Sequence, residues 1–279
     1  MSEATRKVLV TGGGTGLGRA TAMRFAKDGA RVAICGRRQE VLDEAAAGMK
    51  AAGAAEVLAL TCDVRSDEAV NAMAARLHEA WGPLDVLVNN AAGNFPCPAE
   101  KLSPKGWRAV IEIVLNGTFY CSSAFGKAMI DAHATDGRIR SMVNVVADYA
   151  WGAGPGVIHS ASAKAGVLAM SRTLAVEWAR FGIRVNCVSP GPFRSEGTDK
   201  NLWLDDQLAG DILKTIPMRR FTTAEEVAES MFFLADETRA GYISGTCLPV
   251  DGAHWLTGGS LEFMGALERV ALAAKKEKG

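Results

Sequence analysis

The sequence TGGGTGLG, at Thr11–Gly18, directly follows the apolar run KVLVT at 7–11 and opens a segment of helical periodicity. Its glycines at positions 12, 16 and 18 have the spacing G-x-x-x-G-x-G. In such a turn the first glycine permits a tight bend, the second lets the backbone approach a pyrophosphate, and the last allows close helix packing. The following helix N-terminus offers unpaired N–H groups to an anion. Because the glycines lie between a predicted strand and a predicted helix, they indicate a dinucleotide-binding turn rather than a plain structural turn.

Outward from this turn, short β-branched runs alternate with amphipathic segments of helical length. Strands are predicted at Lys7–Thr11, Arg31–Cys35, Glu56–Thr61, Asp85–Asn89, Ser141–Val145, Arg184–Val188 and Thr246–Val250. Helices are predicted at Gly16–Gly29, Gln39–Ala52, Ser66–Trp81, Ser103–Asp131, Ser162–Phe181 and Thr223–Leu234. The strand segments are nearly all apolar, as burial on both faces requires. The alternation predicts an α/β fold, a Rossmann-type doubly wound parallel sheet with helices on both faces.

No linker or compositional break divides the chain, so residues 1–279 are expected to form a single domain. Its core would span about 6–255, followed by a helical extension at about 256–279 with a helix near 261–275. The segment PFRSEGTDKNLWLDD, at 192–206, is expected to form a lid over the site.

Composition excludes several classes of protein. Lysine plus arginine and aspartate plus glutamate both number 31, so no net field draws the chain to nucleic acid or to a membrane surface. No apolar run reaches the ~20 residues of a bilayer span, and the start MSEATRKVLV lacks an apolar signal region. Six scattered cysteines lack CxxC spacing, and the four histidines form no metal-ligand pattern. We therefore expect reduced thiols, no metal and a cytoplasmic location.

The end of the second strand indicates which cofactor is bound. An NAD site places Asp or Glu here, to accept hydrogen bonds from the ribose 2′-hydroxyl. This chain has Arg37 and Arg38 instead, with no acid before Glu40. Guanidinium groups suit phosphate oxygens, so NADP(H) is favoured over the alternative of a solvated pair at a helix start. Asp63, after the third strand, is expected to meet the adenine or else to cap the next helix.

The chain resembles the short-chain dehydrogenase/reductase family in a series of motifs that occur in the family's order over about 6–255. They are TGGGTGLG at 11–18, CDV at 62–64, NNAAG at 89–93, RVNCVSPGP at 184–192 and PVDGAH at 249–254, with a Ser/Ala-rich segment ending in Lys164. The resemblance implies cofactor contacts from Gly12, Gly14, Thr15, Gly16, Leu17, Gly18, Arg37, Arg38, Asp63, Val64, Asn90, Ala91, Gly93, Lys164, Pro190, Gly191, Pro192 and Phe193.

The family's usual catalytic set is Ser, Tyr and Lys with a helper Asn. Lys164 and Asn116 match, but the tyrosine position holds Ser160 and the serine position falls near Ala147. Without both hydroxyl groups, ordinary ketone reduction lacks its carbonyl polariser and its proton carrier. Ser160 has the alternative role of a helix N-cap.

A narrower resemblance, to the 2,4-dienoyl-CoA reductase branch, supplies another acid. It is carried by NNAAGNF at 89–95, LSPKGW at 102–107, VLNGT at 114–118, SASAKAGV at 160–167 and LAVEW at 174–178. In the mitochondrial type of that branch, a tyrosine eleven residues before the serine is the acid, and Tyr149 stands at that place. In the peroxisomal type this tyrosine is absent and a histidine precedes the serine position, as His159 does here. Tyr149 has the alternative of packing against Trp151.

The resemblance implies an enzyme that reduces a 2,4-dienoyl-CoA to a 3-enoyl-CoA with NADPH, in unsaturated fatty-acid β-oxidation. Asn94 and Tyr149 would bind the thioester oxygen, Lys164 the nicotinamide ribose, and Ser160 and Asn116 would support them. The alternative for Asn94 is a purely structural role, because asparagine is common in turns. Acyl-CoA contacts are expected at Arg65, Phe95 and Ser103, and the assembly is expected to be a homotetramer.

Three alternatives remain open from the sequence. The first is a 2-enoyl-CoA reductase acting on a branched or cyclic acyl-CoA. The second is a ketone or alcohol dehydrogenase of the same family that uses Tyr149. The third, a non-catalytic NADP(H)-binding sensor or scaffold, would explain the missing tyrosine but not the retained Lys164.

Overall fold

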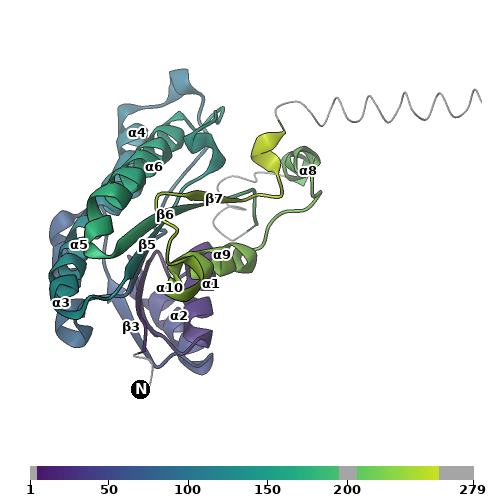
Figure 1. Ribbon diagram of the computed structural model, residues 1–279. Helices are drawn as coiled ribbons and strands as arrows, with labels where there is room; N and C mark the ends of the chain where they lie inside the picture. Colours follow the sequence, from purple (N-terminus) through teal and green to yellow (C-terminus); the bar gives the residue numbers. More distant parts are fainter. Residues whose placement is uncertain (1–4, 195–205, 258–279) are drawn as a thin grey trace, which may run out of the picture.

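A computed structural model describes residues 5–194 and 206–257 of the chain. Its centre is a seven-stranded sheet with the order β3-β2-β1-β4-β5-β6-β7, in which every neighbouring pair is parallel (Figure 1). The strands are β1 (Lys7–Thr11), β2 (Arg31–Gly36), β3 (Glu56–Thr61), β4 (Val86–Asn89), β5 (Arg140–Val145), β6 (Ile183–Pro190) and β7 (Cys247–Val250). The predicted doubly wound parallel sheet is confirmed.

Helices cover both faces of the sheet, with α1, α2 and α9 on one side and α3, α5 and α6 on the other (Figure 1). The α-helices are α1 (Gly16–Lys27), α2 (Gln39–Ala51), α3 (Asp67–Trp81), α4 (Pro104–Ile111), α5 (Gly117–Asp136), α6 (Ile158–Trp178), α8 (Asp206–Thr215), α9 (Ala224–Ala235) and α10 (Glu237–Ala240). Short helical turns are η1 (Ala99–Lys101), η2 (Glu112–Asn116), η3 (Asp148–Ala150), η4 (Ala179–Phe181) and η5 (His254–Leu256).

Two helices differ from the prediction. The segment expected as one helix at 103–131 is divided by η2, a π-helical turn at Glu112–Asn116, and α5 then continues to Asp136. Such turns add one residue per turn and occur often at functional sites. The other helix, α6, begins at Ile158, four residues before the predicted start, so Ser160 lies inside its first turn. The predicted helix at 261–275 and nearly all of the predicted lid at 192–206 lie outside the described residues.

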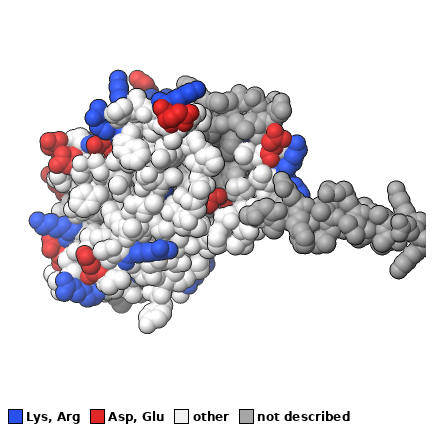
Figure 2. Space-filling view, turned by 90° about the horizontal axis from the view of Figure 1, so that it is seen from above, with Lys and Arg blue, Asp and Glu red and all other residues white. Residues whose placement is uncertain are grey.

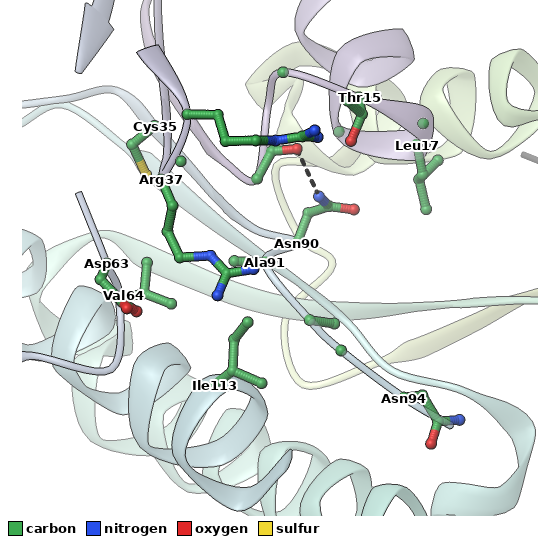
Figure 3. A pocket seen from close by; sticks show the side chains of 18 of the residues that line it. Thr15, Leu17, Cys35, Arg37, Asp63, Val64, Asn90, Ala91, Asn94 and Ile113 are labelled. Atoms are coloured by element: carbon green, nitrogen blue, oxygen red, sulfur yellow. Dashed lines mark hydrogen bonds between the residues drawn. The ribbon is translucent and has the colours of Figure 1, made fainter. Parts of the chain in front are cut away.

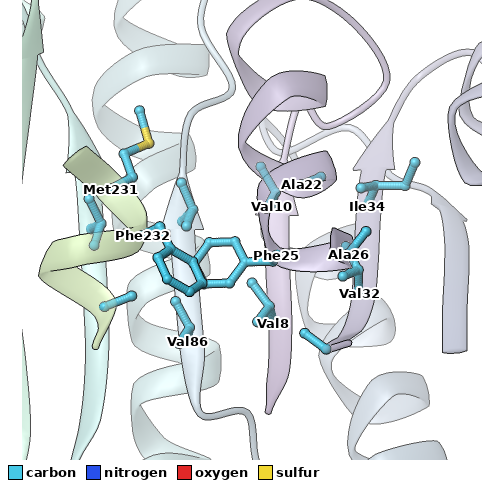
Figure 4. Packing of buried hydrophobic residues seen from close by; sticks show 14 of the residues in the cluster. Val8, Val10, Ala22, Phe25, Ala26, Val32, Ile34, Val86, Met231 and Phe232 are labelled. Atoms are coloured by element: carbon cyan, nitrogen blue, oxygen red, sulfur yellow. The ribbon is translucent and has the colours of Figure 1, made fainter. Parts of the chain in front are cut away.

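The core on the α1 side shows why the strands are apolar throughout. Val8 and Val10 of β1 and Val86 of β4 point to the same layer as Phe25 of α1 and Phe232 of α9 (Figure 4). The two phenyl rings pack with their centroids 5.2 Å apart. Burying a side chain of this size contributes roughly 1.5–3 kcal/mol. The same strands bury their other faces against α3 and α5, so the sheet is held from both sides.

A chain of buried amides and hydroxyls joins the middle of the sheet to α6. Asn89 donates from Nδ2 to Oδ1 of Asn144 (2.8 Å) and to Oγ of Ser122 (3.0 Å). Asn144 in turn donates to Oγ of Ser171 on α6 (2.8 Å), whose hydroxyl donates to the carbonyl of Val167 (2.6 Å). The amide nitrogens of Asn89 and Asn144 and the hydroxyl of Ser171 are thereby satisfied, as is usual for buried polar groups. The ends of β4 and β5 are thereby fixed relative to α6, which carries several of the predicted site residues.

The surface shows no field of one sign on the face seen in Figure 2, where basic and acidic side chains are interspersed around a largely uncharged middle. Among the described residues, no helix combines the length and the apolar character needed to cross a membrane. All six cysteines are free thiols, as predicted, and four of them are buried.

Candidate active site

A cavity of about 400 Å³ opens at the carboxyl ends of the central strands. It lies where β1 has β2 on one side and β4 on the other, so the connections leave in opposite directions. In open α/β sheets this switch point is where ligands bind. Figure 3 shows the cavity bordered by Thr15 and Leu17 at one end and by Asn94 at the other, with Ile113 from η2 below.

The glycine turn forms the wall of the cavity at the N-terminus of α1. Gly12 and Gly16 have φ angles of 65° and 51°, which side-chain-bearing residues rarely adopt. A Cβ on Gly18 would lie only 2.3 Å from the carbonyl oxygen of Gly12, so the helix can approach the turn only with glycine there. Thr15, the N-cap residue of α1, makes no side-chain cap bond, and the first turn of the helix carries no acid. The helix end thus presents its N–H groups to an anion in the cavity.

Thr11 ties this turn to the end of β4. Its Oγ1 accepts hydrogen bonds from the backbone N–H groups of Asn90 and Ala91, both at 3.0 Å. Asn90 returns a bond from Nδ2 to the carbonyl of Thr11 at 3.0 Å. These bonds fix the turn after β1 relative to the segment after β4, and both segments border the cavity.

Arg37 and Arg38 follow β2 and both line the cavity. Figure 3 shows the Arg37 side chain reaching inward on the side where Asp63 and Val64 lie. Arg38 is the N-cap residue of α2 and makes no side-chain cap bond. Both side chains are exposed, so two guanidinium groups stand at the rim of the cavity where β2 ends.

Asp63 does not cap the next helix, because Ser66 does so by accepting a bond from the N–H of Ala69 (3.1 Å). Instead Asp63 forms a bidentate ion pair with Arg65, with Nη2 to Oδ2 at 2.5 Å. The hydrogen bonds from Arg65 hold the pKa of Asp63 below its usual value, against the opposing effect of burial. Arg65 is thus bound to Asp63, and it does not line the cavity.

Another part of the cavity wall is formed by three side chains from two elements, η3 and α6. Tyr149 lies in η3, directly after β5, and its hydroxyl lies 3.1 Å from Oγ of Ser160 on α6. Lys164 follows Ser160 by four residues, so both lie on the same face of α6. All three line the cavity. Ser160 is therefore not a helix cap, since Val157 holds that position, and Tyr149 does not stack on Trp151, which packs on Trp255.

Burial sets the protonation states of this trio. It raises the pKa of Tyr149, the bond from Ser160 opposes that rise, and the charge of Asp148 adds to it. The phenol therefore stays protonated at neutral pH and can donate. Burial lowers the pKa of Lys164 to about 8, while its Nζ donates to the carbonyl of Val145 at 2.5 Å. The ammonium is still the main form at pH 7.

The loop after β4 supplies Asn94 and Phe95. Asn94 Oδ1 accepts a bond from the N–H of Phe95 (2.9 Å), so its Nδ2 group is left as a donor at the cavity wall. Phe95 does not line the cavity; its ring lies against that of His159, with centroids 4.5 Å apart. His159 is fully buried, and burial lowers its pKa. Neither of its ring nitrogens has a hydrogen-bond partner within the described residues.

Most of the predicted site residues thus border one cavity. Those that line it are Gly12, Gly14, Thr15, Gly16, Leu17, Gly18, Arg37, Arg38, Asp63, Val64, Asn90, Ala91, Gly93, Asn94, Tyr149, Ser160, Lys164 and Phe193. Pro190, Gly191 and Pro192 lie beside it at the end of β6, where the N–H of Gly191 bonds the carbonyl of Val250 (2.9 Å). Two others lie off the cavity and have local partners. Asn116, in η2, donates to Oε2 of Glu112 (2.9 Å), and Ser103 caps α4 by accepting from the N–H of Gly106 (3.1 Å).

Several apolar residues that line the cavity were not predicted from the sequence. Cys35 lies near the end of β2 and Cys62 directly after β3, Val41 and Leu42 lie in the first turns of α2, and Ile113 lies in η2. Position at a strand end could have indicated the two cysteines, since the site lies at that edge of the sheet. Ile113 could not have been found in this way, because η2 alters the helical phase that would predict its direction.

These features suit a dinucleotide that carries phosphates. The uncapped end of α1 and the close approach at Gly12 and Gly18 accommodate a pyrophosphate, and the arginines after β2 accommodate a further anion. The cavity then leads to a protonated phenol and a buried ammonium. The fold and the cavity define a dinucleotide-binding α/β protein.

Comparison with known proteins narrows this class. A family model described as Enoyl-(Acyl carrier protein) reductase matches residues 12–253. A Bacillus subtilis protein named Probable 2,4-dienoyl-CoA reductase, with the qualifier (2E)-enoyl-CoA-producing, is 46% identical over 90% of this chain and 97% of its own length. A Caenorhabditis elegans protein named Probable 2,4-dienoyl-CoA reductase 3, (3E)-enoyl-CoA-producing, is 35% identical over 88% of this chain and 79% of its own.

A crystal structure of a short chain dehydrogenase from Bacillus anthracis is 46% identical and superposes with a TM-score of 0.77, covering 89% of this chain and 96% of that one. The chain belongs to the short-chain dehydrogenase/reductase family, and it is an oxidoreductase. The resemblance drawn from the motifs is confirmed, and the alternative of a non-catalytic scaffold is set aside.

Proposed function

We propose that the protein reduces a 2,4-dienoyl-CoA to an enoyl-CoA with NADPH. The observation that carries this proposal is the pairing of Tyr149 with Ser160 in the cavity, with Lys164 one helical turn further along α6. This trio keeps an acid in a chain that lacks the usual family tyrosine. Its phenol enters from η3 rather than from α6, which alters where a proton can be delivered.

When bound, NADPH supplies a hydride, which is accepted by the δ carbon of the dienoyl thioester. Negative charge then develops on the thioester oxygen and requires hydrogen-bond donors already in place. Tyr149 Oη and the Nδ2 group of Asn94 are donors at the cavity wall. Ser160 orients the phenol, and Lys164 would stabilise negative charge nearby and hold the ribose hydroxyls of the cofactor. One hydride and one proton balance the reduction, and Tyr149 gives the proton.

The carbon that receives the proton decides the product. Protonation at the α carbon gives a 3-enoyl-CoA, and protonation at the γ carbon gives a 2-enoyl-CoA. The names of the Bacillus subtilis and Caenorhabditis elegans relatives differ on this point. We favour the 3-enoyl product here, because a donor bound to the thioester oxygen lies closer to the adjacent α carbon than to the γ carbon.

NADPH is proposed over NADH because of the side chains after β2. Arg37 and Arg38 line the cavity, while the first acid after the strand, Glu40, does not. Arginine binds phosphate oxygens in a planar, bidentate manner. A 2′-phosphate would meet positive charge at this rim, whereas a 2′-hydroxyl would find no carboxylate at the end of β2 to accept its hydrogen bond.

The test is turnover of the reduced nicotinamide with a panel of substrates. We expect oxidation of NADPH with 2,4-hexadienoyl-CoA, and product analysis by NMR should give 3-hexenoyl-CoA. Reduction of 2-hexenoyl-CoA with no turnover of the diene would instead support the 2-enoyl-CoA reductase, which the description of the family model also favours. Turnover of simple ketones alone would support the dehydrogenase alternative and overturn the proposal.

A homotetramer is proposed from the long helices α5 and α6. They expose large apolar side chains, with Phe119 53% exposed and Val176 80% exposed. Closed symmetric association buries such residues. Light scattering should give four chains per particle, and a Phe119→Asp, Val176→Asp double variant should give smaller particles. A wild-type monomer would contradict the assignment.

A further inference from the structure

The imidazole of His254 joins three segments that lie far apart in the sequence. His254 begins η5, just after β7, and its Nδ1 lies 3.0 Å from Oδ2 of Asp148 in η3. Its Nε2 lies 3.1 Å from Oγ1 of Thr215, at the end of α8. Figure 1 shows η5, after β7, lying directly beside α8 and away from the sheet. Both ring nitrogens are therefore used in contacts between separate elements.

The hydrogen-bonding groups around the ring of His254 favour its protonated form. The hydroxyl of Thr215 has one proton, and it donates to the carbonyl of Ile212 at 2.7 Å. Thr215 Oγ1 can then only accept, so Nε2 of His254 must donate. The carboxylate of Asp148 also only accepts, so Nδ1 must donate as well. This set of contacts suits an imidazolium, which carries a proton on both ring nitrogens.

Asp148 also bonds the backbone of Tyr149, so it links His254 to the residue that carries the phenol. Its Oδ1 accepts a bond from the backbone N–H of Tyr149 at 2.9 Å, while its Oδ2 faces His254. A second contact runs in parallel, since the rings of Trp151 and Trp255 pack edge to face with centroids 5.8 Å apart. The turn that carries the phenol is thus joined to η5 on both sides of Tyr149.

The charges around His254 favour the protonated ring. The hydrogen bond to Asp148 raises the pKa of His254 above its usual value, burial opposes this, and the charges of Asp148 and Asp251 add to the rise. Asp251 is itself engaged by the N–H groups of Ala253 and Trp255. On α8, the Asp211 and Lys214 side chains pair with each other at 2.8 Å.

We propose that His254 is a positioning residue that, as an imidazolium, holds the turn bearing Tyr149 and the end of α8 in one arrangement. The proposal rests on the proposed function in one respect, namely that Tyr149 delivers the proton. When His254 loses its proton, the Nε2–H···Thr215 bond is lost or the hydroxyl must leave Ile212. The charge opposite Asp148 is lost too. The rate should therefore fall as the pH rises through the titration of His254, while cofactor binding is little affected.

The first test needs no turnover. Proton–carbon NMR of the full chain, with the His254 signal assigned from its loss in His254→Gln, should show this ring titrating above the ordinary value of about 6.5. In Asp148→Asn the same signal should titrate at a lower pH. A wild-type ring that titrates below the ordinary value, or one that ignores Asp148→Asn, would overturn the proposal whether or not the enzyme reduces dienoyl-CoA.

The second test measures the reaction. We expect His254→Gln to lower kcat roughly tenfold, with the KM for NADPH changed by less than about twofold, because the loss falls on the positioning of the acid. The fall in rate that wild type shows across the His254 titration should disappear in this variant. His78→Gln, on the exposed side of α3, is the matched control and should keep the wild-type profile. An unchanged profile in His254→Gln would contradict the positioning role.

Discussion

The hydroxyl of Tyr149 lies 3.1 Å from the hydroxyl of Ser160, although the two residues belong to different elements. Tyr149 follows β5 in a short helical turn, and Ser160 lies in the first turn of α6. The pair places a phenol beside Lys164 in a chain whose α6 has no tyrosine before that lysine. A serine thus stands at the usual tyrosine position, while the tyrosine comes from the turn after β5, near the position that the family's serine usually occupies.

Replacing Tyr149 with phenylalanine should remove the acid and leave the cavity intact. We expect kcat on 2,4-hexadienoyl-CoA to fall by about 10²-fold or more, the range of general acid catalysis, with little change in the Kd for NADPH. Steady-state kinetics and fluorescence titration measure the two quantities. Tyr242→Phe is the control, because Tyr242 is fully exposed. A kcat that survives in Tyr149→Phe would assign the proton to another group.

Lys164 should make the free energy of unfolding depend on pH. Burial lowers its pKa from the ordinary 10.5 to about 8. Between these values the unfolded chain binds more protons than the native one, so the contribution of Lys164 to stability rises with pH. A shift of this size corresponds to roughly 3 kcal/mol. Urea unfolding at pH 8 and pH 10 should therefore show wild type gaining relative to Lys164→Met.

The control for this comparison is Lys127→Met, since Lys127 is exposed on α5. It should leave the difference between the two pH values unchanged. If Lys164→Met and wild type responded equally to pH, Lys164 would not be a buried ammonium. The Cys35 and Cys62 thiols, whose pKa values burial also raises, are common to all three proteins and cancel in the comparison.

Arg37→Asp should reverse the preference between the two nicotinamide cofactors. The substitution removes a guanidinium at the cavity rim and supplies a carboxylate that would repel a 2′-phosphate but accept a bond from a 2′-hydroxyl. We expect the KM for NADPH to rise by at least about tenfold, or roughly 1.4 kcal/mol, with a smaller change for NADH. Equal effects on both cofactors would remove Arg37 from the recognition of the phosphate.

Gly18→Ala should abolish cofactor binding with a moderate loss of stability. The new Cβ would lie 2.3 Å from the carbonyl oxygen of Gly12, so the turn would have to move away from α1. Isothermal titration with NADPH measures the binding. Gly48→Ala on α2, where the nearest atom lies at 3.5 Å, is the matched control and should bind normally. Normal binding by Gly18→Ala would show that the turn can shift without loss.

Local sequence predicted the strands well because each is a short apolar run with burial on both faces, and such a pattern survives any choice of partners. Local sequence predicted the helices less well where contacts with the rest of the fold alter the helical geometry. The π-helical turn at Glu112–Asn116 lies where the helix closely approaches the loop that follows β3. A Cβ on Gly117, the next residue, would lie only 2.8 Å from the Val64 side chain in that loop. Nothing in the apolar periodicity of that segment signals such a contact.

The same distinction applies within the site. Arg65 was expected at the substrate, but Asp63 two residues earlier binds its guanidinium. Ser103 was expected there too, and instead caps α4. Both partners lie within three residues in the sequence and could have been predicted, because side chains at such spacings often bind neighbouring backbone or side-chain groups.

The parallel sheet and the glycine turn at its switch point could be predicted from local sequence, because φ angles that favour glycine and runs of buried β-branched residues are local constraints. The tertiary structure decided which side chains meet. His254 and Asp148, 106 residues apart, and Tyr149 and Ser160, on different elements, come together only when β5 and β7 join one sheet and α6 packs against it. The pKa values of His254 and Tyr149 follow from that packing, because burial and nearby charges, which have no signature in the linear chain, shift them.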